Sequence, residues 1–200
     1  MSVYSKARSS KLLVGILKAI FRLKVTGSEK EPADSGFIIC ANHMSNADPI
    51  ILGVAIKGSI RFMAKKELFR VPVLSWFIKL FGAYSVDRKN SDAGAVKMTI
   101  NILKNGENVG LYPQARRIKG KNPTGMPVMN GAALIAMRAG CGILPVTIKT
   151  KKFKSGPFRK TEAIIHDFVP YEAIMEKAGS PPDYRKVMDE IFAVICEPLN

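Results

Sequence analysis

Short apolar runs alternate along this chain with segments whose apolar residues recur at the spacing of an α-helix. The apolar runs are rich in β-branched residues and predict buried strands at 36–41, 60–64, 83–86, 108–113, 142–149 and 161–169. Pro, Ser, Asp and Gly punctuate the segments between them, which predict helices at 49–58, 72–82, 91–106 and 131–140 and a C-terminal helix opened by Ser180 and Asp183. Strands separated by single helices predict an α/β fold, with a mostly parallel sheet covered by helices on both faces.

The first 28 residues differ from the rest because they contain basic residues and no acid. On a helix, Lys11, Lys18 and Arg22 fall on one narrow face, and apolar residues occupy most of the remainder. This pattern is typical of an amphipathic helix that lies in a lipid interface, with its cations against anionic headgroups. The alternative is a helix that packs on the domain's own core. We therefore divide the chain into a basic amphipathic N-terminal helix, residues 1–28, and one domain, residues 29–200.

The net charge of +15 over 200 residues indicates an anionic partner, which can be a membrane surface, a nucleic acid or a phosphorylated small molecule. The motifs include no RNP-type aromatic pattern, zinc-ligand spacing or clear recognition helix, so we expect no nucleic acid partner. No apolar run reaches the roughly 18 residues that a membrane-spanning helix needs. Three scattered cysteines favour reduced thiols on the cytosolic side, and no metal site is expected.

Asn42 and His43 follow the predicted strand 36–41 directly, and Asp48 comes shortly after the histidine. Working residues of α/β sheets gather where strands end and loops begin, so this pair is a candidate site. A histidine that acts as a base near neutral pH needs one ring nitrogen free and the other held by a carboxylate. The alternative is that Asp48 only caps the next helix and His43 only hydrogen-bonds its loop. The second histidine, His166, lies in a strand pattern without a partner motif, and we interpret it as structural.

Four sequence blocks, in order, give the chain a specific resemblance. Asn42-His43 with Asp48 matches an Asn-His-(four residues)-Asp signature, NHxxxxD, and the later blocks are GAYSVDR (82–88), LYPQARR (111–117) and GILPVTI (142–148). Together they resemble the glycerolipid acyltransferases over about residues 36 to 150. In size and layout the chain is most similar to the bacterial members that acylate lysophosphatidate.

The resemblance implies an enzyme of phospholipid synthesis that moves a fatty acyl group from a thioester to the free hydroxyl of lysophosphatidate, giving phosphatidate. His43 would be the base and Asp48 would hold its ring, while Arg88 and Arg117 would grip the acceptor phosphate. The residues expected to bind substrate are Asn42, Arg88, Gln114, Arg116 and Arg117.

The same resemblance implies partners and a location. The acyl donor would be acyl-CoA or acyl carrier protein, and no cofactor is required. The protein would bind anionic lipids and lie peripherally or monotopically on the cytoplasmic face of the cell membrane.

The third block departs from the family's usual Phe-Pro-Glu-Gly-Thr-Arg. Gln114 replaces the Glu and loses its charge, Ala115 replaces the Gly, and Arg116 adds a cation in place of Thr. We expect Ala115 to exclude most backbone conformations with positive φ that Gly permits. These changes leave open another acceptor, such as glycerol 3-phosphate, another lysophospholipid or an ornithine-type lipid. They also leave open a membrane-binding relative without activity.

Two further parts of a site are expected. An acyl chain needs an apolar groove, for which the segment 71–81 with Trp76 is a candidate wall, with ordinary core as the alternative. The tetrahedral oxyanion of acyl transfer needs donors, for which backbone N–H groups of the turn after His43 are candidates. The chain contains no GxSxG motif, and direct transfer needs no covalent enzyme intermediate.

Overall fold

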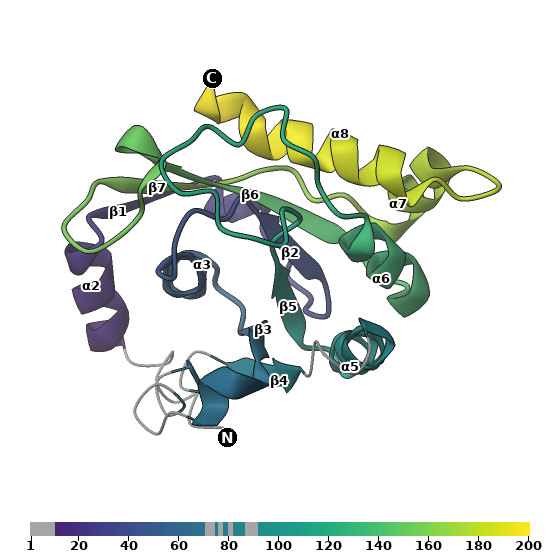
Figure 1. Cartoon of the computed structure of the whole chain (residues 1–200), viewed down its shortest axis with the longest axis horizontal. Coiled ribbons are helices and arrows are strands. Elements are labelled where there is room, and N and C mark those ends of the chain that lie inside the picture. Colours follow the sequence, from purple (N-terminus) through teal and green to yellow (C-terminus); the bar gives the residue numbers. More distant parts are fainter. Residues whose placement is uncertain (1–10, 71–74, 76–77, 80–81, 87–91) are drawn as a thin grey trace.

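The computed structural model describes residues 11–70, 75, 78–79, 82–86 and 92–200. These residues form one seven-stranded sheet with the strand order β1-β7-β6-β2-β5-β3-β4 (Figure 1). The strands are β1 (Leu23–Thr26), β2 (Ile38–Ala41), β3 (Ile60–Lys65), β4 (Ala83–Val86), β5 (Asn108–Leu111), β6 (Ile143–Thr150) and β7 (Thr161–Ile165).

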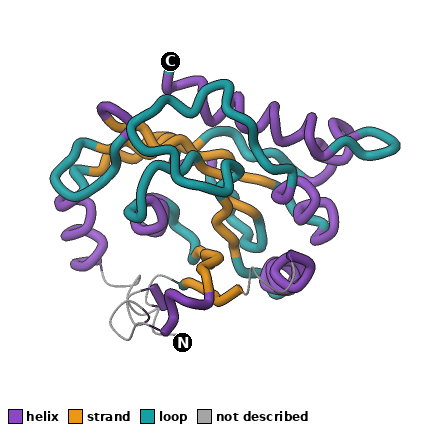
Figure 2. The backbone as a smooth tube through the Cα atoms, in the orientation of Figure 1, coloured by secondary structure: helices purple, strands orange, loops and turns teal. Residues whose placement is uncertain are grey.

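Helices cover both faces of this sheet, as the tube in Figure 2 shows. They are α2 (Lys11–Ile20), α3 (Asp48–Ala55), α5 (Asp92–Lys104), α6 (Gly131–Ala139), α7 (Tyr171–Ala178) and α8 (Tyr184–Cys196). The short 3-10 helices are η1 (Ser28–Lys30), η2 (Lys66–Arg70), η3 (Lys151–Phe153) and η4 (Glu197–Leu199). Helices α2 and α3 pack on one face, and α5, α6 and α8 pack on the other, so the predicted α/β architecture is confirmed.

The pairing of the strands explains where a site can form. All neighbouring strands run parallel except β6 and β7, which are antiparallel. Strand β2 lies between β5 and β6, with Ile38 opposite both Val109 and Ile143. Because these three strands are parallel, their carboxyl ends meet at one edge of the sheet. The expectation of a mostly parallel sheet is therefore confirmed, and its central strand leads directly into the candidate site.

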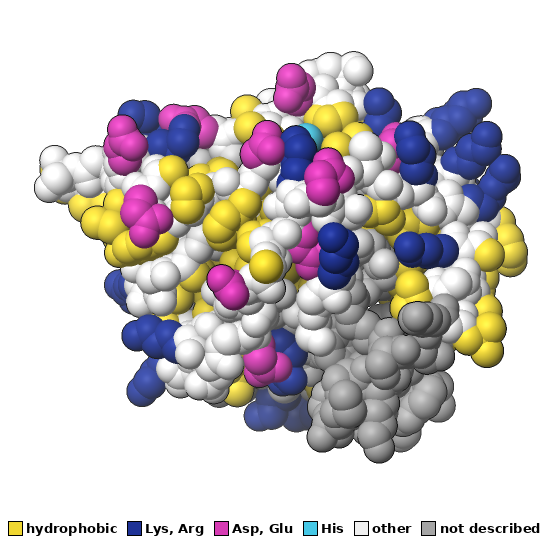
Figure 3. Space-filling model, turned by 180° about the vertical axis from the view of Figure 1, so that it is seen from behind, with side chains coloured by type: hydrophobic (Ala, Val, Ile, Leu, Met, Phe, Trp, Pro, Cys, Tyr) yellow, Lys and Arg dark blue, Asp and Glu magenta, His cyan; other side chains and the backbone are white. Residues whose placement is uncertain are grey.

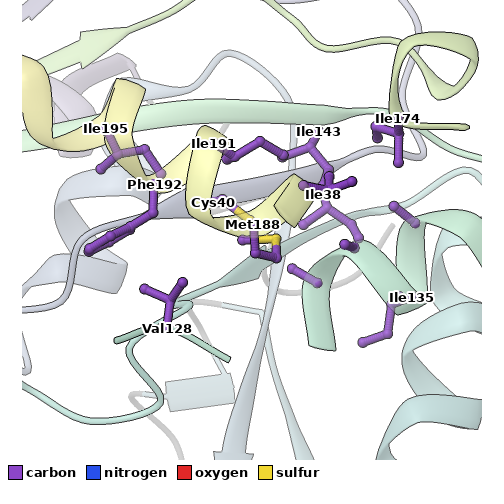
Figure 4. Packing of buried hydrophobic residues seen from close by; sticks show 14 of the residues in the cluster. Ile38, Cys40, Val128, Ile135, Ile143, Ile174, Met188, Ile191, Phe192 and Ile195 are labelled. Carbon is purple, nitrogen blue, oxygen red and sulfur yellow. The ribbon is translucent and has the colours of Figure 1, made fainter. Parts of the chain in front are cut away.

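Alternate residues of the central strands face two separate hydrophobic clusters, as the two-residue period of a strand requires. Ile38 points to the cluster beneath α8, and Ile39 points to the cluster beneath α3. Figure 4 shows the first cluster, where Met188 and Ile191 of α8 lie near the sheet residues Ile38 and Ile143. These four side chains are at most 3% exposed. Each such aliphatic side chain stabilises the fold by about 1.5–3 kcal/mol through burial, so the sheet is a rigid support for the loops at its edge.

The N-terminal segment differs from the sequence prediction. The helix ends at Ile20 rather than continuing toward residue 28, because Arg22 adopts a left-handed backbone conformation with φ of 43°. Residues 23–26 then form β1, which pairs in parallel with β7 and belongs to the main sheet. The boundary expected at residue 28 is therefore wrong as a structural division.

Helix α2 is divided between core and surface. Leu17 and Ile20 pack against the cluster beneath α3, whereas Leu12 is 75% exposed and Ile16 is 47% exposed. Among the described residues, no helix is both long and apolar enough to cross a membrane.

Two other predictions at the C-terminal end need correction. The sixth predicted strand, 161–169, ends at Ile165 as β7, and helix α7 was not predicted. The predicted start of the C-terminal helix is confirmed, because the Asp183 side chain caps α8 by accepting hydrogen bonds from the N–H groups of Arg185 and Lys186.

Candidate active site

The residue that follows β2 fixes the end of the strand. Asn42 is fully buried, its amide donates to the carbonyl oxygen of Ile148 at 2.9 Å, and its side-chain oxygen accepts from the Ile148 N–H at 2.7 Å. Both ends of the amide are therefore used by the backbone of β6. The expectation that Asn42 binds substrate is wrong for this reason, and the residue instead anchors the loop that begins at His43.

His43 and Asp48 are in direct contact. The imidazole Nδ1 lies 2.8 Å from Oδ2 of Asp48, and the two side chains are 17% and 0% exposed. Within the described residues, Nε2 of His43 has no protein partner. The predicted contact is confirmed: one ring nitrogen is held by a buried carboxylate, and the other is not engaged by a described residue.

Asp48 has a different local role from the one expected. Ala47 is the N-cap of α3, and no side chain caps this helix. The Asp48 carboxylate turns back toward the preceding loop, where Oδ2 accepts from the N–H groups of Met44 at 2.6 Å and Ser45 at 2.8 Å. The alternative interpretation, in which Asp48 only caps the next helix, is therefore wrong. Its backbone bonds hold the carboxylate in place, which in turn fixes the orientation of the His43 ring.

A residue that the sequence analysis did not identify completes the surroundings of this carboxylate. Ser155, in the segment between β6 and β7, donates a hydrogen bond to Oδ1 of Asp48 and lies 2.9 Å from the hydroxyl of Ser45. Its separation from Asp48 is 107 residues, so no local motif joins the two. Asp48 thus receives bonds on both carboxylate oxygens, and Ser155 is a candidate positioning residue.

The ring of His43 stacks on Tyr112. The ring centroids are 3.9 Å apart and the planes are inclined by 13°. Burial, with a smaller contribution from the charge of Asp48, raises the pKa of Tyr112 well above its usual value, so the phenol stays neutral. The stacking restricts rotation of the imidazole, and Tyr112 therefore helps to orient the candidate base.

Gln114, in the third sequence block, and Ile118, just after that block, form hydrogen bonds with the backbone of His43. The side-chain oxygen of Gln114 accepts from the His43 N–H at 2.6 Å, and the N–H of Ile118 donates to the His43 carbonyl oxygen at 2.8 Å. Gln114 is 6% exposed, and its amide nitrogen has no hydrogen-bond acceptor among the described residues. The structure thus gives Gln114 a supporting role at His43 and leaves one buried donor unused.

Ala115 adopts the conformation that its side chain was expected to exclude. Its φ is 55°, in the left-handed region, and its N–H donates to the carbonyl oxygen of Tyr112 at 2.9 Å. An L-residue in this region costs about 1–2 kcal/mol relative to the right-handed form. The replacement of Gly has therefore been absorbed as local strain, and the turn retains its hydrogen bonds to His43.

The arginines predicted to bind phosphate are only partly described. Nη1 of Arg117 donates a hydrogen bond to the side-chain oxygen of Asn46, which brings this arginine to the loop between His43 and Asp48. Arg116 is exposed beside it. Arg88 lies outside the described residues, as does most of the predicted groove wall at 71–81, including Trp76.

Three of the N–H groups in the turn after His43 already donate hydrogen bonds within the loop. Those of Met44 and Ser45 donate to Asp48, and that of Ala47 donates to the Ser45 hydroxyl at 2.9 Å. The N–H of His43 itself donates to Gln114. The N–H groups of Met44, Ser45 and Ala47 therefore support the loop in this arrangement, and a role of the turn in stabilising an oxyanion stays a prediction.

The cysteines are poor nucleophiles. Burial raises the pKa of Cys141 and of Cys196 to about 11, so these thiols are protonated and poorly nucleophilic near neutral pH. Within the described part of the chain, no three His, Cys, Asp or Glu side chains gather to hold a metal ion. His166 binds the Thr147 hydroxyl through Nε2 at 2.8 Å.

The sequence of this chain is similar to those of two bacterial proteins named as acyltransferases. A 1-acyl-sn-glycerol-3-phosphate acyltransferase of Bacillus subtilis is 36% identical over 155 residues, which are 75% of this chain and 76% of that protein. A protein of the same name from Streptococcus pneumoniae is 38% identical over 172 residues, or 84% of this chain, but the match spans only 59% of its length.

A solved structure and a family model also match this chain. The crystal structure of a 1-acyl-sn-glycerophosphate acyltransferase from Thermotoga maritima shares the fold, with a TM-score of 0.68 and 23% identity over 96% of this chain and 82% of that one. The acyltransferase family model matches residues 22–149, which include every element around His43 described above except Ser155. The chain belongs to the acyltransferase family.

Proposed function

We propose that this chain transfers a fatty acyl group from a thioester to the free hydroxyl of lysophosphatidate, which gives phosphatidate. The observation that carries the proposal is the His43 imidazole, held through Nδ1 by a fully buried carboxylate and left without a described partner at Nε2. The Bacillus subtilis and Streptococcus pneumoniae relatives, named 1-acyl-sn-glycerol-3-phosphate acyltransferases, support lysophosphatidate as the acceptor.

The chemistry follows from the arrangement of His43 and Asp48. The acceptor hydroxyl is a poor nucleophile until its proton is removed, and Nε2 takes that proton as the oxygen attacks the thioester carbonyl carbon. Asp48 stabilises the imidazolium that forms and holds the ring in the correct tautomer. The tetrahedral intermediate then expels the thiolate, which recovers the proton from the imidazolium. Acyl transfer is direct, and the chain itself is not acylated.

Binding of the acceptor phosphate is assigned to arginines of the second and third sequence blocks. Arg117 is tied to the His43 loop through Asn46, so a phosphate on its guanidinium lies close to the catalytic ring. Arg88 contributes a second cation, and Arg116 extends the positive charge of the same turn. Gln114, whose buried amide nitrogen lacks an acceptor among the described residues, donates to the bound acceptor.

The acceptor is a lipid, so the enzyme works at a membrane surface. The exposed apolar residues of α2, Leu12 and Ile16, enter the interface on the cytoplasmic face, and Lys18 and Arg22 meet anionic headgroups. The donor is acyl-CoA or acyl carrier protein, and the reaction needs no cofactor because the thioester is already activated.

The test of this function compares acceptors with and without a phosphate. The wild-type protein should show a much higher kcat/KM for lysophosphatidate than for monoacylglycerol. Arg117→Ala should lose roughly 10- to 100-fold in kcat/KM with lysophosphatidate and little with monoacylglycerol, because charge-assisted hydrogen bonds to the phosphate disappear. Arg117→Lys should recover only a small part of the loss.

Arg138→Ala is the matched control, since Arg138 is exposed on α6, on the other face of the sheet. It should leave both acceptors unaffected. Equal proportional losses on the two acceptors in Arg117→Ala would contradict phosphate recognition by this residue. The same comparison in Arg88→Ala tests the second arginine.

A further inference from the structure

The segment that connects β6 to β7 is unusually basic. Residues 151–160 read KKFKSGPFRK and contain no acid. The basic residues are all exposed, and none forms an ion pair with a described residue; they are Lys151, Lys152, Lys154, Arg159 and Lys160. Unpaired like charges in one short segment repel one another, so the fold gains nothing from gathering them.

The same segment exposes a large aromatic side chain. Phe158 is 76% exposed, more than any other large hydrophobic residue described, and its φ of 60° lies in the left-handed region. A bulky residue rarely adopts this conformation, and here it gains no burial in return. The backbone is held in place nevertheless, because the Phe158 N–H donates to the carbonyl oxygen of Ile20 at 2.6 Å.

That hydrogen bond joins the basic segment to the end of α2. A second bond, from the N–H of Thr161 to the carbonyl oxygen of Arg22 at 3.5 Å, continues the junction. Helix α2 exposes Leu12 and Ile16, which are four residues apart and share one face. Figure 3 shows Lys and Arg side chains gathered beside hydrophobic ones along the edge formed by α2 and this segment.

We propose that residues 151–160 form a second membrane-docking element, which joins the exposed face of α2 in one composite surface for a bilayer that contains anionic lipids. Phe158 enters the interfacial layer, and the flanking cations contact the headgroups. Charge complementarity identifies the occupant, because the surface offers cations and an apolar anchor and contains no acid in this segment. The inference rests on the proposed function only in that the acceptor is a lipid.

The position of this segment relative to the candidate base fits such a surface. Ser155, midway along it, donates to Asp48 and so lies beside the His43 loop. A membrane that contacts Phe158 and its neighbouring cations therefore lies close to the site at which a lipid acceptor must arrive. The docking element and the site share one short stretch of chain, which keeps the distance between them fixed.

The experiment measures co-sedimentation of the full chain with phosphatidylcholine vesicles and with vesicles that also contain phosphatidylglycerol. Replacing Lys151, Arg159 and Lys160 by Gln should lower the partition coefficient on anionic vesicles roughly 100-fold at low salt, or about fivefold for each cation. Phe158→Asn should lower it about tenfold. Asn is chosen because it tolerates a positive φ, so the backbone is preserved.

The matched control removes the same charge and one exposed apolar side chain from the opposite face of the sheet. It replaces Lys97, Lys104 and Arg138 by Gln and Met98 by Asn, on α5 and α6. This variant should bind anionic vesicles almost as well as the wild type. If it loses as much binding as the loop variants, net charge alone drives association and the docking element is refuted.

Combining the variants distinguishes the contribution of residues 151–160 to vesicle binding from that of α2. Leu12→Ser with Ile16→Ser should weaken binding independently, and the loop substitutions should reduce it by the same further factor in that background. Unchanged binding in the loop variants, with a loss in the α2 variant, would leave α2 as the docking element and overturn the proposal.

Activity on a water-soluble short-chain lysophosphatidate separates this proposal from the enzymatic one. The cation and Phe158 variants should retain that activity while losing it on vesicle-borne acceptor. A protein inactive on both acceptors, whose vesicle binding still falls as described, would refute the enzyme and keep the docking element. Tight binding of the wild type to random DNA, with no preference for anionic vesicles, would refute a membrane as the occupant.

Discussion

The two histidines of this chain occupy contrasting sites. His43 follows a central strand, pairs through Nδ1 with the buried carboxylate of Asp48, and stacks on Tyr112. His166 follows the antiparallel strand β7 and shares a hydrogen bond with the hydroxyl of Thr147, which itself donates to the carbonyl oxygen of Ile195.

The difference lies in the group that each imidazole contacts, which is a carboxylate for His43 and a hydroxyl for His166. A carboxylate stabilises the protonated ring, whereas a hydroxyl does so only weakly. Burial and nearby Lys30 lower the pKa of His166 below its usual value, against smaller opposing effects of Glu197 and Asp167. The same side chain therefore serves as a candidate base in one region and as a neutral structural residue in the other.

Replacing each histidine in turn gives the largest contrast. His43→Ala should lower kcat for acyl transfer by roughly 10²- to 10⁴-fold, the usual contribution of a general base. His166→Gln should keep most of the activity, because Gln can still bond Thr147 and no reaction step involves this residue. Both variants should show normal circular dichroism. Comparable losses in the two variants would remove the distinction between them.

The second contrast removes the charge beside His43 but keeps the shape of the side chain. Asp48→Asn should lower kcat by roughly 10²-fold or more, because the amide neither stabilises the imidazolium nor enforces the correct tautomer. The effect should appear in kcat more than in the KM for the acceptor. Turnover close to that of the wild type would show that the carboxylate serves the loop, through Met44 and Ser45, rather than the chemistry.

Ser155 offers a smaller and more specific effect. Ser155→Ala removes one hydrogen bond to the Asp48 carboxylate and should lower kcat about tenfold with little change in KM. Ser155→Thr keeps the hydroxyl and should recover much of the loss. Ser35→Ala, at an exposed position, is the control. A change in KM alone, or no rescue by Thr, would argue against a positioning role.

The smallest expected effect concerns stability at His166. Its pKa is lower in the folded state than in the unfolded chain, so the unfolded state binds more protons between the two values. The contribution of His166 to the free energy of unfolding is therefore largest above the unfolded pKa of about 6.5. It decreases as the pH falls below that value. The melting temperature of the wild type should therefore drop more between pH 7 and pH 5.5 than that of His166→Gln. An equal drop in melting temperature in the two proteins would contradict a lowered pKa of His166 in the folded state.

Much of the site could be predicted from sequence because its central contact is local. His43 and Asp48 are five residues apart, at the end of an apolar strand, so a strand, a turn and a helix start suffice to bring them together. Local spacing did not reveal which atoms the carboxylate binds. The same Asp-Pro pair that indicates a helix cap also occurs where Asp turns back to its own loop.

The remaining misses depend on contacts distant in sequence or on weak local patterns. Ser155 lies in a loop without a motif, so only the fold brings it to Asp48. Strand β1 was missed because its apolar residues extend the pattern of α2, although the alternating exposure of Leu23–Thr26 shows the two-residue period of a strand. Asn42 was assigned to substrate because it belongs to the Asn-His-(four residues)-Asp block, and the block does not reveal whether the amide binds substrate or backbone.

The most direct test of the central claim is an acceptor panel with a labelled acyl thioester, in which lipid products are identified by mass. We expect the wild-type protein to form phosphatidate from lysophosphatidate faster than it acylates glycerol 3-phosphate, other lysophospholipids or an ornithine-type lipid. We also expect His43→Ala to form almost none under the same conditions. Absence of phosphatidate with the wild type, or an equal yield from His43→Ala, would contradict the account.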